Sequence, residues 1–411
     1  MKKVAFYVAT AVFLIVATII VISYGKGYIF NFGNGKIGIL GTGLLAATSQ
    51  PDSAGIYIDG HLTSATNNTI SLPPGEYDVK IIKSGYSQWQ KKIKIEKEVV
   101  SSAYALLIPT APKLDNITDI GVSNPVLDPT RTKIAYVVSS LDNPRRNGVY
   151  ILDMGLRPIL TLQSSSTQIA DDTIDNFSKA SLAWSPDAKE IIATISAGPA
   201  SQRGEPNTST TYLLKTNFNE NPQDITATLT SLNSTWSEQK INQDKSQLLG
   251  FKTKLQNLIK ENFTILSWSE DETKILYIAS RSATLSSIIN PSLIGTNSTP
   301  EEREIKKGVV YVYDIKEDRN YKILDSVPEN RSQDFINAFP LNWFTDSKHL
   351  IYVVDNKISI MDYDGQNKTT IYAGPFIDDY VFSWPDGSKI LILTNLGNLT
   401  ISPNLYTIGL K

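Results

Sequence analysis

Residues 182–196 read LAWSPDAKEIIATIS and carry the pattern that decides the fold of most of this chain. An apolar stretch ends at Trp184, a turn follows at Pro186 and Asp187, and a second apolar stretch begins after Lys189. Proline fixes φ and aspartate favours turns, while aromatic and β-branched residues favour strands. The stretch therefore predicts two short strands joined by a tight turn.

The same pattern recurs along the chain. Its other copies are LSWSEDETKILYIAS (266–280), LNWFTDSKHLIYVV (341–354), SWPDGSKILILT (383–394), where Trp384 is displaced by one place, and the degenerate VLDPTRTKIAYVV (126–138). Most copies are followed by further strands, as in KISIMD (357–362), which makes a four-stranded unit. Propeller repeats are about 40–50 residues long. We therefore expect a β-propeller of about five blades over residues 115–411, or six if residues 212–262 contain another.

Several copies lie further apart than one repeat, which requires insertions. One insertion is expected at residues 234–263, where DKSQLLGFKTKLQNLIKENF (244–263) has helix-like apolar spacing at Leu248, Leu249, Leu255 and Leu258. Polar loops are expected near 197–211 and 281–307. The tryptophans are expected to pack between blades rather than to bind a ligand. These Trp-Ser-Pro-Asp turns resemble TolB-type β-propeller repeats, and the resemblance rests on this short motif over most of residues 115–411.

Residues 48–108 have a different, period-two pattern. The stretch GIYID (55–59) alternates and runs into the hairpin signal Asp59-Gly60, and Pro73-Pro74-Gly75 predicts a second turn, at which glycine accepts a positive φ. Alternating strands follow at 76–83 and 89–96. The region predicts a small antiparallel β-sandwich. The stretch PTAP (109–112) then indicates a stiff linker over residues 109–114.

These turns, in their order, carry a second resemblance. PDSA (51–54), IYIDG (56–60), LPPGEY (72–77), KSGY (83–86) and Trp89 are similar to the PEGA domain family, with a mild departure at the two central positions of the turn that gives the family its name. The resemblance implies a small β-sandwich of extracytoplasmic and surface-associated bacterial and archaeal proteins. It implies no catalytic residues.

The first 27 residues indicate a membrane anchor. Lys2 and Lys3 precede VAFYVATAVFLIVATIIVI (4–22), an apolar run close to the length that spans a bilayer. Positive charge on the short side predicts a cytoplasmic N-terminus and an extracytoplasmic body. A cleaved signal peptide is the alternative, because Ser23 and Gly25 form a small-x-small pattern. Residues 28–47 are then a stem outside the membrane.

The stem contains a possible dinucleotide motif. In KIGILGTGLLA (36–46), Gly41, Gly43 and Ala46 match G-x-G-x-x-G/A, and Asp59 follows at a suitable distance. That motif must open a helix whose N-terminus faces the pyrophosphate. The turn-rich stretch TSQPD (48–52) leaves no room for such a helix. We therefore expect a glycine-rich strand and no nucleotide site.

Composition excludes several kinds of chemistry. With 39 basic and 41 acidic residues, the net charge of −2 gives no electrostatic case for nucleic acid. There is no cysteine, so disulfides, thiolate zinc sites and cysteine nucleophiles are excluded. The two histidines, His61 and His349, lie far apart in sequence, which disfavours Ser-His-Asp catalysis and histidine metal sites.

Two acidic stretches remain as candidate cation sites. DDTID (171–175) lacks the spaced ligands and glycine of a calcium loop, so a solvated loop is expected. Asp362, Asp364 and Gly365 begin like a calcium loop, but the pattern fails at Gln366, so a hairpin turn is expected. The sequence thus predicts no catalytic, cofactor-binding or metal-binding residues.

Together these patterns predict a non-enzymatic, membrane-anchored protein of the cell envelope. Its propeller would bind a protein, peptide or glycan, and the PEGA-like domain would be a surface or spacer module. One alternative is an extracytoplasmic hydrolase that acts on glycans through carboxylates in the propeller channel. The other is a purely structural component of the cell surface.

Overall fold

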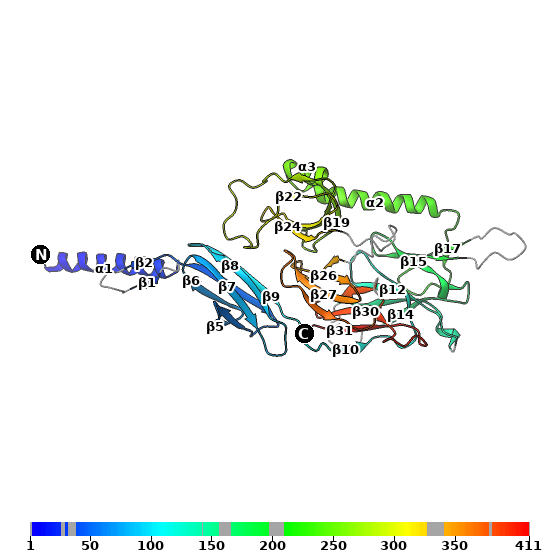
Figure 1. Ribbon diagram of the computed structural model, residues 1–411. Coiled ribbons are helices and arrows are strands. Elements are labelled where there is room, and N and C mark those ends of the chain that lie inside the picture. Colours follow the sequence, from blue (N-terminus) through cyan, green and yellow to red (C-terminus); the bar gives the residue numbers. More distant parts are fainter. Residues whose placement is uncertain are drawn as a thin grey trace, which may run out of the picture.

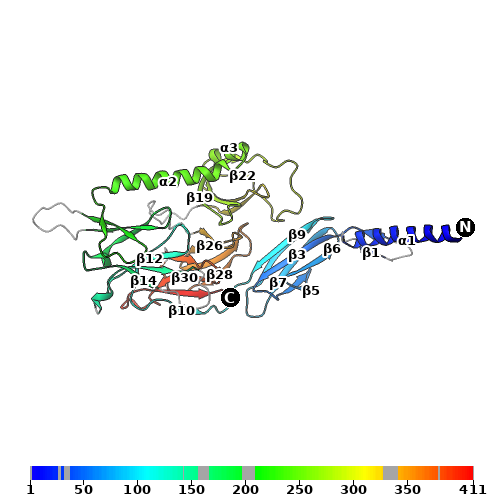
Figure 2. The same cartoon turned by 180° about the vertical axis from the view of Figure 1, so that it is seen from behind.

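The computed structural model describes residues 2–25, 29–31, 38–141, 143–155, 166–196, 209–326, 341–377 and 380–410. Helix α1 (Lys2–Gly25) and the hairpin of β1 (Ile29–Asn31) and β2 (Gly38–Leu40) come first in the chain. A small β domain and a large β domain follow (Figure 1). Seen from behind, the same order is clear, and the C-terminal end lies beside the boundary between the two β domains (Figure 2).

The predicted transmembrane anchor is wrong. In α1 the side chains are described for residues 6–22. Among the residues that the structure describes, no helix combines the length and the apolar character needed to cross a membrane.

The small β domain is a sandwich of two sheets, as predicted, but it is not wholly antiparallel, because β3 and β9 pair in parallel. One sheet has the order β6-β3-β9 and the other the order β5-β4-β7-β8. Strand alternation points one side of each sheet inward, where Leu45, Ile56, Val79, Ile81 and Trp89 are buried in one cluster. Burial of each such side chain contributes about 1.5–3 kcal/mol. The strands are β3 (Gly43–Gln50), β4 (Gly55–Ile58), β5 (His61–Ala65), β6 (Asn68–Leu72), β7 (Gly75–Ile82), β8 (Trp89–Ile95) and β9 (Val100–Leu106).

The glycine motif of residues 41–46 leads into a strand, as predicted. Strand β3 runs from Gly43 through Ala46 to Gln50, and β4 begins at Gly55. No helix therefore follows the motif, and a pyrophosphate would have no helix N-terminus to bind.

Within its described residues, the large β domain contains five four-stranded sheets, one for each copy of the repeat. We number them in chain order as sheets 1 to 5. Sheet 1 contains β11 (Ser123–Leu127), β12 (Lys133–Val138), β13 (Gly148–Asp153) and β14 (Ser166–Asp171); sheet 2 contains β15 (Ser181–Trp184), β16 (Glu190–Ile195), β17 (Thr210–Lys215) and β18 (Gln223–Asp224). Sheet 3 contains β19 (Phe263–Trp268), β20 (Lys274–Ala279), β23 (Val310–Asp314) and β24 (Arg319–Leu324); sheet 4 contains β25 (Leu341–Trp343), β26 (His349–Val354), β27 (Lys357–Asp362) and β28 (Thr369–Tyr372). Sheet 5 contains β29 (Val381–Ser383), β30 (Lys389–Thr394), β31 (Asn404–Gly409) and, from the start of the domain, β10 (Leu114–Asn116).

The repeated motif forms the same turn in every sheet. One residue of each turn has a left-handed backbone, and its N–H donates to the carbonyl oxygen three residues earlier. These residues are Arg131, Ala188, Glu272, Ser347 and Gly387. Four of them carry side chains in a region that favours glycine, so the rest of the motif sets this conformation.

Buried apolar clusters join most neighbouring sheets. Separate clusters connect sheet 5 with sheet 1, sheet 1 with sheet 2, sheet 3 with sheet 4, and sheet 4 with sheet 5. The indole N–H of Trp184 donates to the carbonyl oxygen of Val126 on the preceding sheet, at 3.0 Å. That of Trp343 donates to Ser267 on sheet 3, at 3.4 Å. Tryptophans of the motif therefore connect sheets, as expected.

Sheets 2 and 3 are not joined in this way, so the ring formed by the five sheets does not close. The predicted β-propeller is therefore wrong. The chain between them forms α2 (Leu229–Leu249) and α3 (Thr253–Asn262). Leu255, Leu258 and Ile259 of α3 cover the face of sheet 3 that faces away from sheet 4. Trp268 stacks on Phe251 between the two helices, with ring centroids 5.8 Å apart. Within the described ranges, no buried apolar cluster joins sheets 2 and 3.

The predicted insertions have different outcomes. The helical spacing of residues 244–263 is confirmed by the end of α2 and by α3. Residues 212–262 form the rest of β17, then β18 and the two helices, and contain no sixth repeat. The loop near 281–307 contains the two-residue strands β21 (Ala283–Thr284) and β22 (Glu304–Ile305). Most of the loop near 197–211 lies outside the described residues.

Candidate functional site

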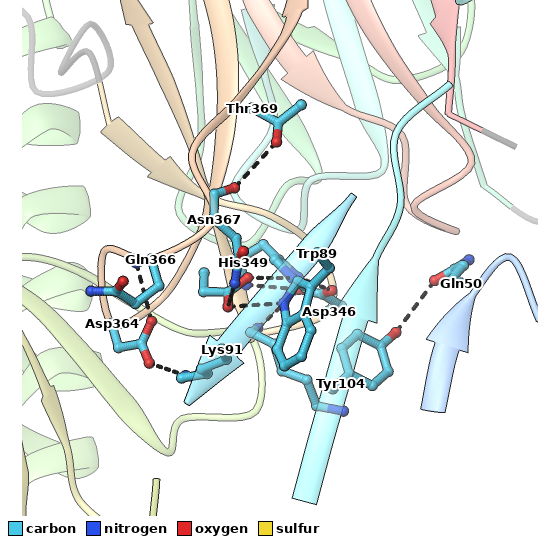
Figure 3. Close-up of polar contacts among 12 residues, drawn as sticks. Gln50, Trp89, Lys91, Tyr104, Asp346, His349, Asp364, Gln366, Asn367 and Thr369 are labelled. Carbon is cyan, nitrogen blue, oxygen red and sulfur yellow. Dashed lines mark hydrogen bonds and ion pairs between the residues drawn. The ribbon is translucent and has the colours of Figure 1, made fainter. Parts of the chain in front are cut away.

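The small and large β domains meet at a buried junction. Strands β8 and β9 of the small domain lie against sheet 4 and against the loop that precedes β22 (Figure 3). Leu106 and Ile108, at the end of the small domain, share an apolar cluster with Phe344, Ile358 and Ile408 of sheets 4 and 5. The polar groups of the junction surround a histidine.

His349, the first residue of β26, is 3% exposed and lies between two carboxylates. Its Nδ1 is 2.6 Å from an oxygen of Asp346, and its Nε2 is 3.3 Å from Asp362, its cross-strand partner. Two ring nitrogens that both face carboxylates must both donate, so the ring is an imidazolium. Burial opposes this charge, but the two carboxylates outweigh burial and raise the pKa of His349 to about 9.

The carboxylate of Asp362 connects this histidine to the small domain. The indole N–H of Trp89, at the start of β8, donates to Asp362 at 3.2 Å. The amide of Asn367 donates to the same oxygen at 2.9 Å, and its own oxygen accepts the backbone N–H of Gln90 at 3.0 Å. One carboxylate thus joins β26, the turn after β27, and strand β8.

A second ion pair lies two residues further along the same strand. Lys91 contacts the carboxylate of Asp364, whose side chain is 0% exposed. The same carboxylate oxygen accepts Asn297 and Thr299, each at 2.7 Å. Burial alone would raise the pKa of Asp364, but Lys91 and these two donors lower it. Trp89 is also buried in the apolar cluster of the sandwich, so its ring packs inside the small domain while its indole N–H reaches the large domain.

The edges of the junction are also closely fitted. Lys348 lies 3.6 Å from the ring centroid of Tyr104 on β9, in a cation–π contact. The backbone N–H of Gly295 donates to Glu96 at 3.2 Å. A Cβ at Gly295 would lie 2.3 Å from Val99 on the small domain, and its φ of +70° also favours glycine. The two domains therefore touch through backbone as well as side chains.

The chemistry of the junction is that of a structural connection. Its charges are buried in pairs, and removal of one partner from such a pair typically costs about 3–5 kcal/mol. The ring nitrogens of His349 are both occupied, which leaves neither free to accept a proton from a nucleophile. In the parts of the chain that are described, no group of three or more metal-ligating side chains is placed to hold a metal ion.

A second feature lies where the ring of sheets is open. A cleft of about 610 Å³ runs between α2 and the first turn of sheet 2. It is open to solvent, and the described side chains that line it are polar and mostly exposed: Asp187, Gln239, Asn242, Gln243, Ser246 and Gln247. Helix α2 lies along one side of the large domain, between β17 and α3 (Figure 1). The amide of Gln247 reaches Glu272 in the first turn of sheet 3, at 2.9 Å.

Of the acidic stretches and histidines noted in the sequence, the structure brings His349 and Asp362 together at the junction and places the others elsewhere. Asp172 caps the 3-10 turn of residues 177–179 through Ser178, and Asp175 accepts the hydroxyl of Tyr212 at 3.2 Å. His61 is exposed on β5. The stretch from Asp362 to Gly365 forms the turn between β27 and β28, as predicted.

Sequence reasoning missed the junction. Trp89 and Lys91 stand at i and i+2, as do Asp362 and Asp364, and these two pairs face each other across 273 residues of sequence. Each pair taken alone has an ordinary local explanation, as a strand face or as a turn. A single sequence gives no signal that associates them.

Comparison with known proteins supports the domain content. The PEGA domain family matches residues 42–109, which contain the small sandwich. The chain therefore contains a PEGA domain. No curated protein matches the chain.

Among solved structures, TolB from Agrobacterium tumefaciens is 13% identical, with a TM-score of 0.22, over 70% of this chain and 78% of the other. TolB from Acinetobacter baumannii is 13% identical, with a TM-score of 0.22, over 81% and 59%. The β-propeller domain of the trilobed protease from Pyrococcus furiosus is 12% identical, with a TM-score of 0.21, over 90% and 95%. Scores this low give no information on activity.

Proposed function

We propose that this chain is a non-enzymatic extracytoplasmic protein whose large β domain binds a protein, peptide or glycan while the PEGA domain acts as a rigid spacer. The observation that carries the proposal is the buried junction. A spacer positions a binding domain only if the two domains move as one body, and the Trp89–Asp362 and Lys91–Asp364 contacts supply that rigidity. The PEGA match supports a location outside the cytoplasm.

The charges of the molecule favour binding over catalysis. His349, Asp364 and their partners are occupied in structural contacts. Among the described residues, one carboxylate, Asp187, lines the cleft beside α2. Most glycosidases require two carboxyl groups on either side of the scissile bond, about 5–9.5 Å apart. One carboxylate in a cleft of amides and hydroxyls can orient a ligand, but it does not supply both an acid and a base.

The rigidity is tested by a distance measurement between the domains. The chain has no cysteine, so Thr63→Cys on β5 and Ala227→Cys before α2 introduce two exposed sites for spin labels. We expect a single narrow distance distribution by double electron–electron resonance. Gly295→Val should broaden it by forcing the junction apart. The matched control is Gly308→Val, which also has a positive φ but has no atom within 4 Å of its Cβ position. A broad distribution in the parent protein would remove the basis for a rigid spacer.

Binding and location need their own readouts. The intact chain is titrated with envelope proteins, peptides and oligosaccharides while bound fraction and product release are both followed. We expect saturable binding of one class without turnover. Turnover, or no saturable binding of any class, contradicts the proposal. A phosphatase fusion that is active only after export tests the location, and an inactive but stable fusion contradicts it.

A further inference from the structure

The cleft beside α2 owes its existence to the open ring. Because α3 covers the exposed face of sheet 3, sheet 2 has no partner sheet there, and α2 spans the distance instead. The helix face toward the domain begins with apolar side chains, Leu232 and Trp236, which are partly buried. One turn later it continues with Gln239 and Gln243. The same face therefore changes from apolar to polar where it borders the cleft.

This polar lining has a particular composition. Five of the six lining side chains are uncharged amides or a hydroxyl, and none is apolar. Within the described part of the chain, the side chains of Gln239, Asn242 and Gln243 make no hydrogen bond to another protein group. Each amide offers two N–H donors and a carbonyl acceptor. The cleft thus presents closely spaced groups that both donate and accept.

One charge accompanies these amides. The carboxylate of Asp187 accepts the hydroxyl of Ser185 at 2.7 Å, and this hydrogen bond lowers the pKa of Asp187, so the group is an acceptor at neutral pH. Lys189 lies 3.4 Å from its second oxygen and offsets part of the charge. The lining therefore suits a neutral ligand better than an acidic one.

We propose that this cleft is a binding site for a neutral oligosaccharide, held by hydrogen bonds from the amides of α2 and by the Asp187 carboxylate. Sugar hydroxyls also donate and accept at neighbouring positions, which is the complement of this lining. An extended peptide is the less favoured occupant, because peptide recognition relies on apolar anchors in pockets and none of the described side chains that line the cleft is apolar. The inference rests on the proposed binding function and assigns it a ligand class and a place.

The test uses the intact chain and defined probes. Maltohexaose, cellohexaose, xylohexaose and chitohexaose are titrated calorimetrically, with hexagalacturonate as the acidic counterpart and a Gly-Ser hexapeptide as the peptide probe. We expect at least one neutral hexasaccharide to bind saturably and hexagalacturonate to bind at least tenfold more weakly. Gln239→Ala with Gln243→Ala should weaken neutral binding at least tenfold. These side chains have no protein partners, so the fold should be unaffected.

The matched control is a second double variant on the same helix. Ser237→Ala with Lys245→Ala changes exposed residues on the opposite face and should leave the affinity unchanged. Three outcomes overturn the inference while leaving a binding function intact. They are sugar binding that survives the Gln239 and Gln243 changes, binding of the hexapeptide in place of sugars, and binding of hexagalacturonate as tight as that of the neutral sugars. Absence of neutral-sugar binding also overturns the inference, whereas the proposed function is overturned by the failure of every partner class to bind or by turnover of a bound partner.

Discussion

The charge on His349 predicts that the protein loses stability at alkaline pH. Its pKa of about 9 in the folded state exceeds the value of about 6.5 expected in the unfolded chain. Because the folded pKa is raised, the stabilisation is fully present below about pH 6.5 and is lost as the pH rises through 9. At about 1.36 kcal/mol per pH unit, the whole effect is about 3 kcal/mol, of which about 2 kcal/mol disappears between pH 7 and pH 9.5.

Urea unfolding at a series of pH values measures this effect. The histidine is buried, so little of the interaction is lost to solvent screening. His349→Gln should lower stability by about 3–5 kcal/mol at pH 7, since Asp346 and Asp362 would lose their cation. Its stability should then fall by about 2 kcal/mol less than that of the parent between pH 7 and pH 9.5.

The control is the other histidine. His61 is exposed on β5, so His61→Gln should retain both the stability and the pH dependence of the parent. With two histidines in the chain, NMR can follow both imidazoles directly. Parallel pH dependence in the parent and in His349→Gln, or a His349 titration midpoint below pH 7, would refute the reasoning.

Three further changes test other contacts. Lys91→Met should destabilise the protein by about 3–5 kcal/mol in urea unfolding because Asp364 loses its cation, and addition of Asp364→Asn should recover part of this loss; additive effects would show that the pair does not interact. Gly148→Ala should lower the thermal midpoint by several degrees, because a Cβ there would lie 2.0 Å from a carbonyl oxygen of β14. Gly308→Ala, which has open space at its Cβ, should lower the free energy of unfolding by about 1 kcal/mol or less. Equal decreases in the two thermal midpoints would contradict the steric argument. Trp184→Ala should cost about 3–5 kcal/mol by separating sheets 1 and 2, and a chemical-denaturation midpoint within error of the parent would count against that packing role.

The local parts of the fold are those that the sequence predicts well. The five turns follow from short motifs because their hydrogen bonds close within three residues, as between Ala188 and Ser185. The alternation of Val79 and Ile81 likewise predicts the inner face of the sandwich. Gly75 is an exception: it begins β7 without a positive φ, so the turn before it does not need glycine at this position for conformational reasons.

The predictions that the structure contradicts concern contacts between distant residues, which no local sequence pattern encodes. Ring closure depends on which surface covers sheet 3, and Phe251 and α3 take the place that a neighbouring sheet would occupy. The apolar spacing of Leu255 and Leu258 predicts a helix, but it does not say which sheet the helix covers. The same limit applies to the junction, where Lys91 finds its buried partner 273 residues away.

The pairing of β10 with β31 has a consequence for how the chain acquires its structure. Leu114 lies opposite Ile408, so the last strand of the large domain completes a sheet with the first. During synthesis, β10 remains unpaired until almost the whole chain has been made. Contacts between residues so far apart in sequence also form slowly. The PEGA domain, which precedes β10 and consists of strands close together in sequence, can fold long before. A nascent chain would thus carry one finished domain beside a strand edge that is open to wrong partners, and a chain cut short before Asn404 would keep that edge exposed.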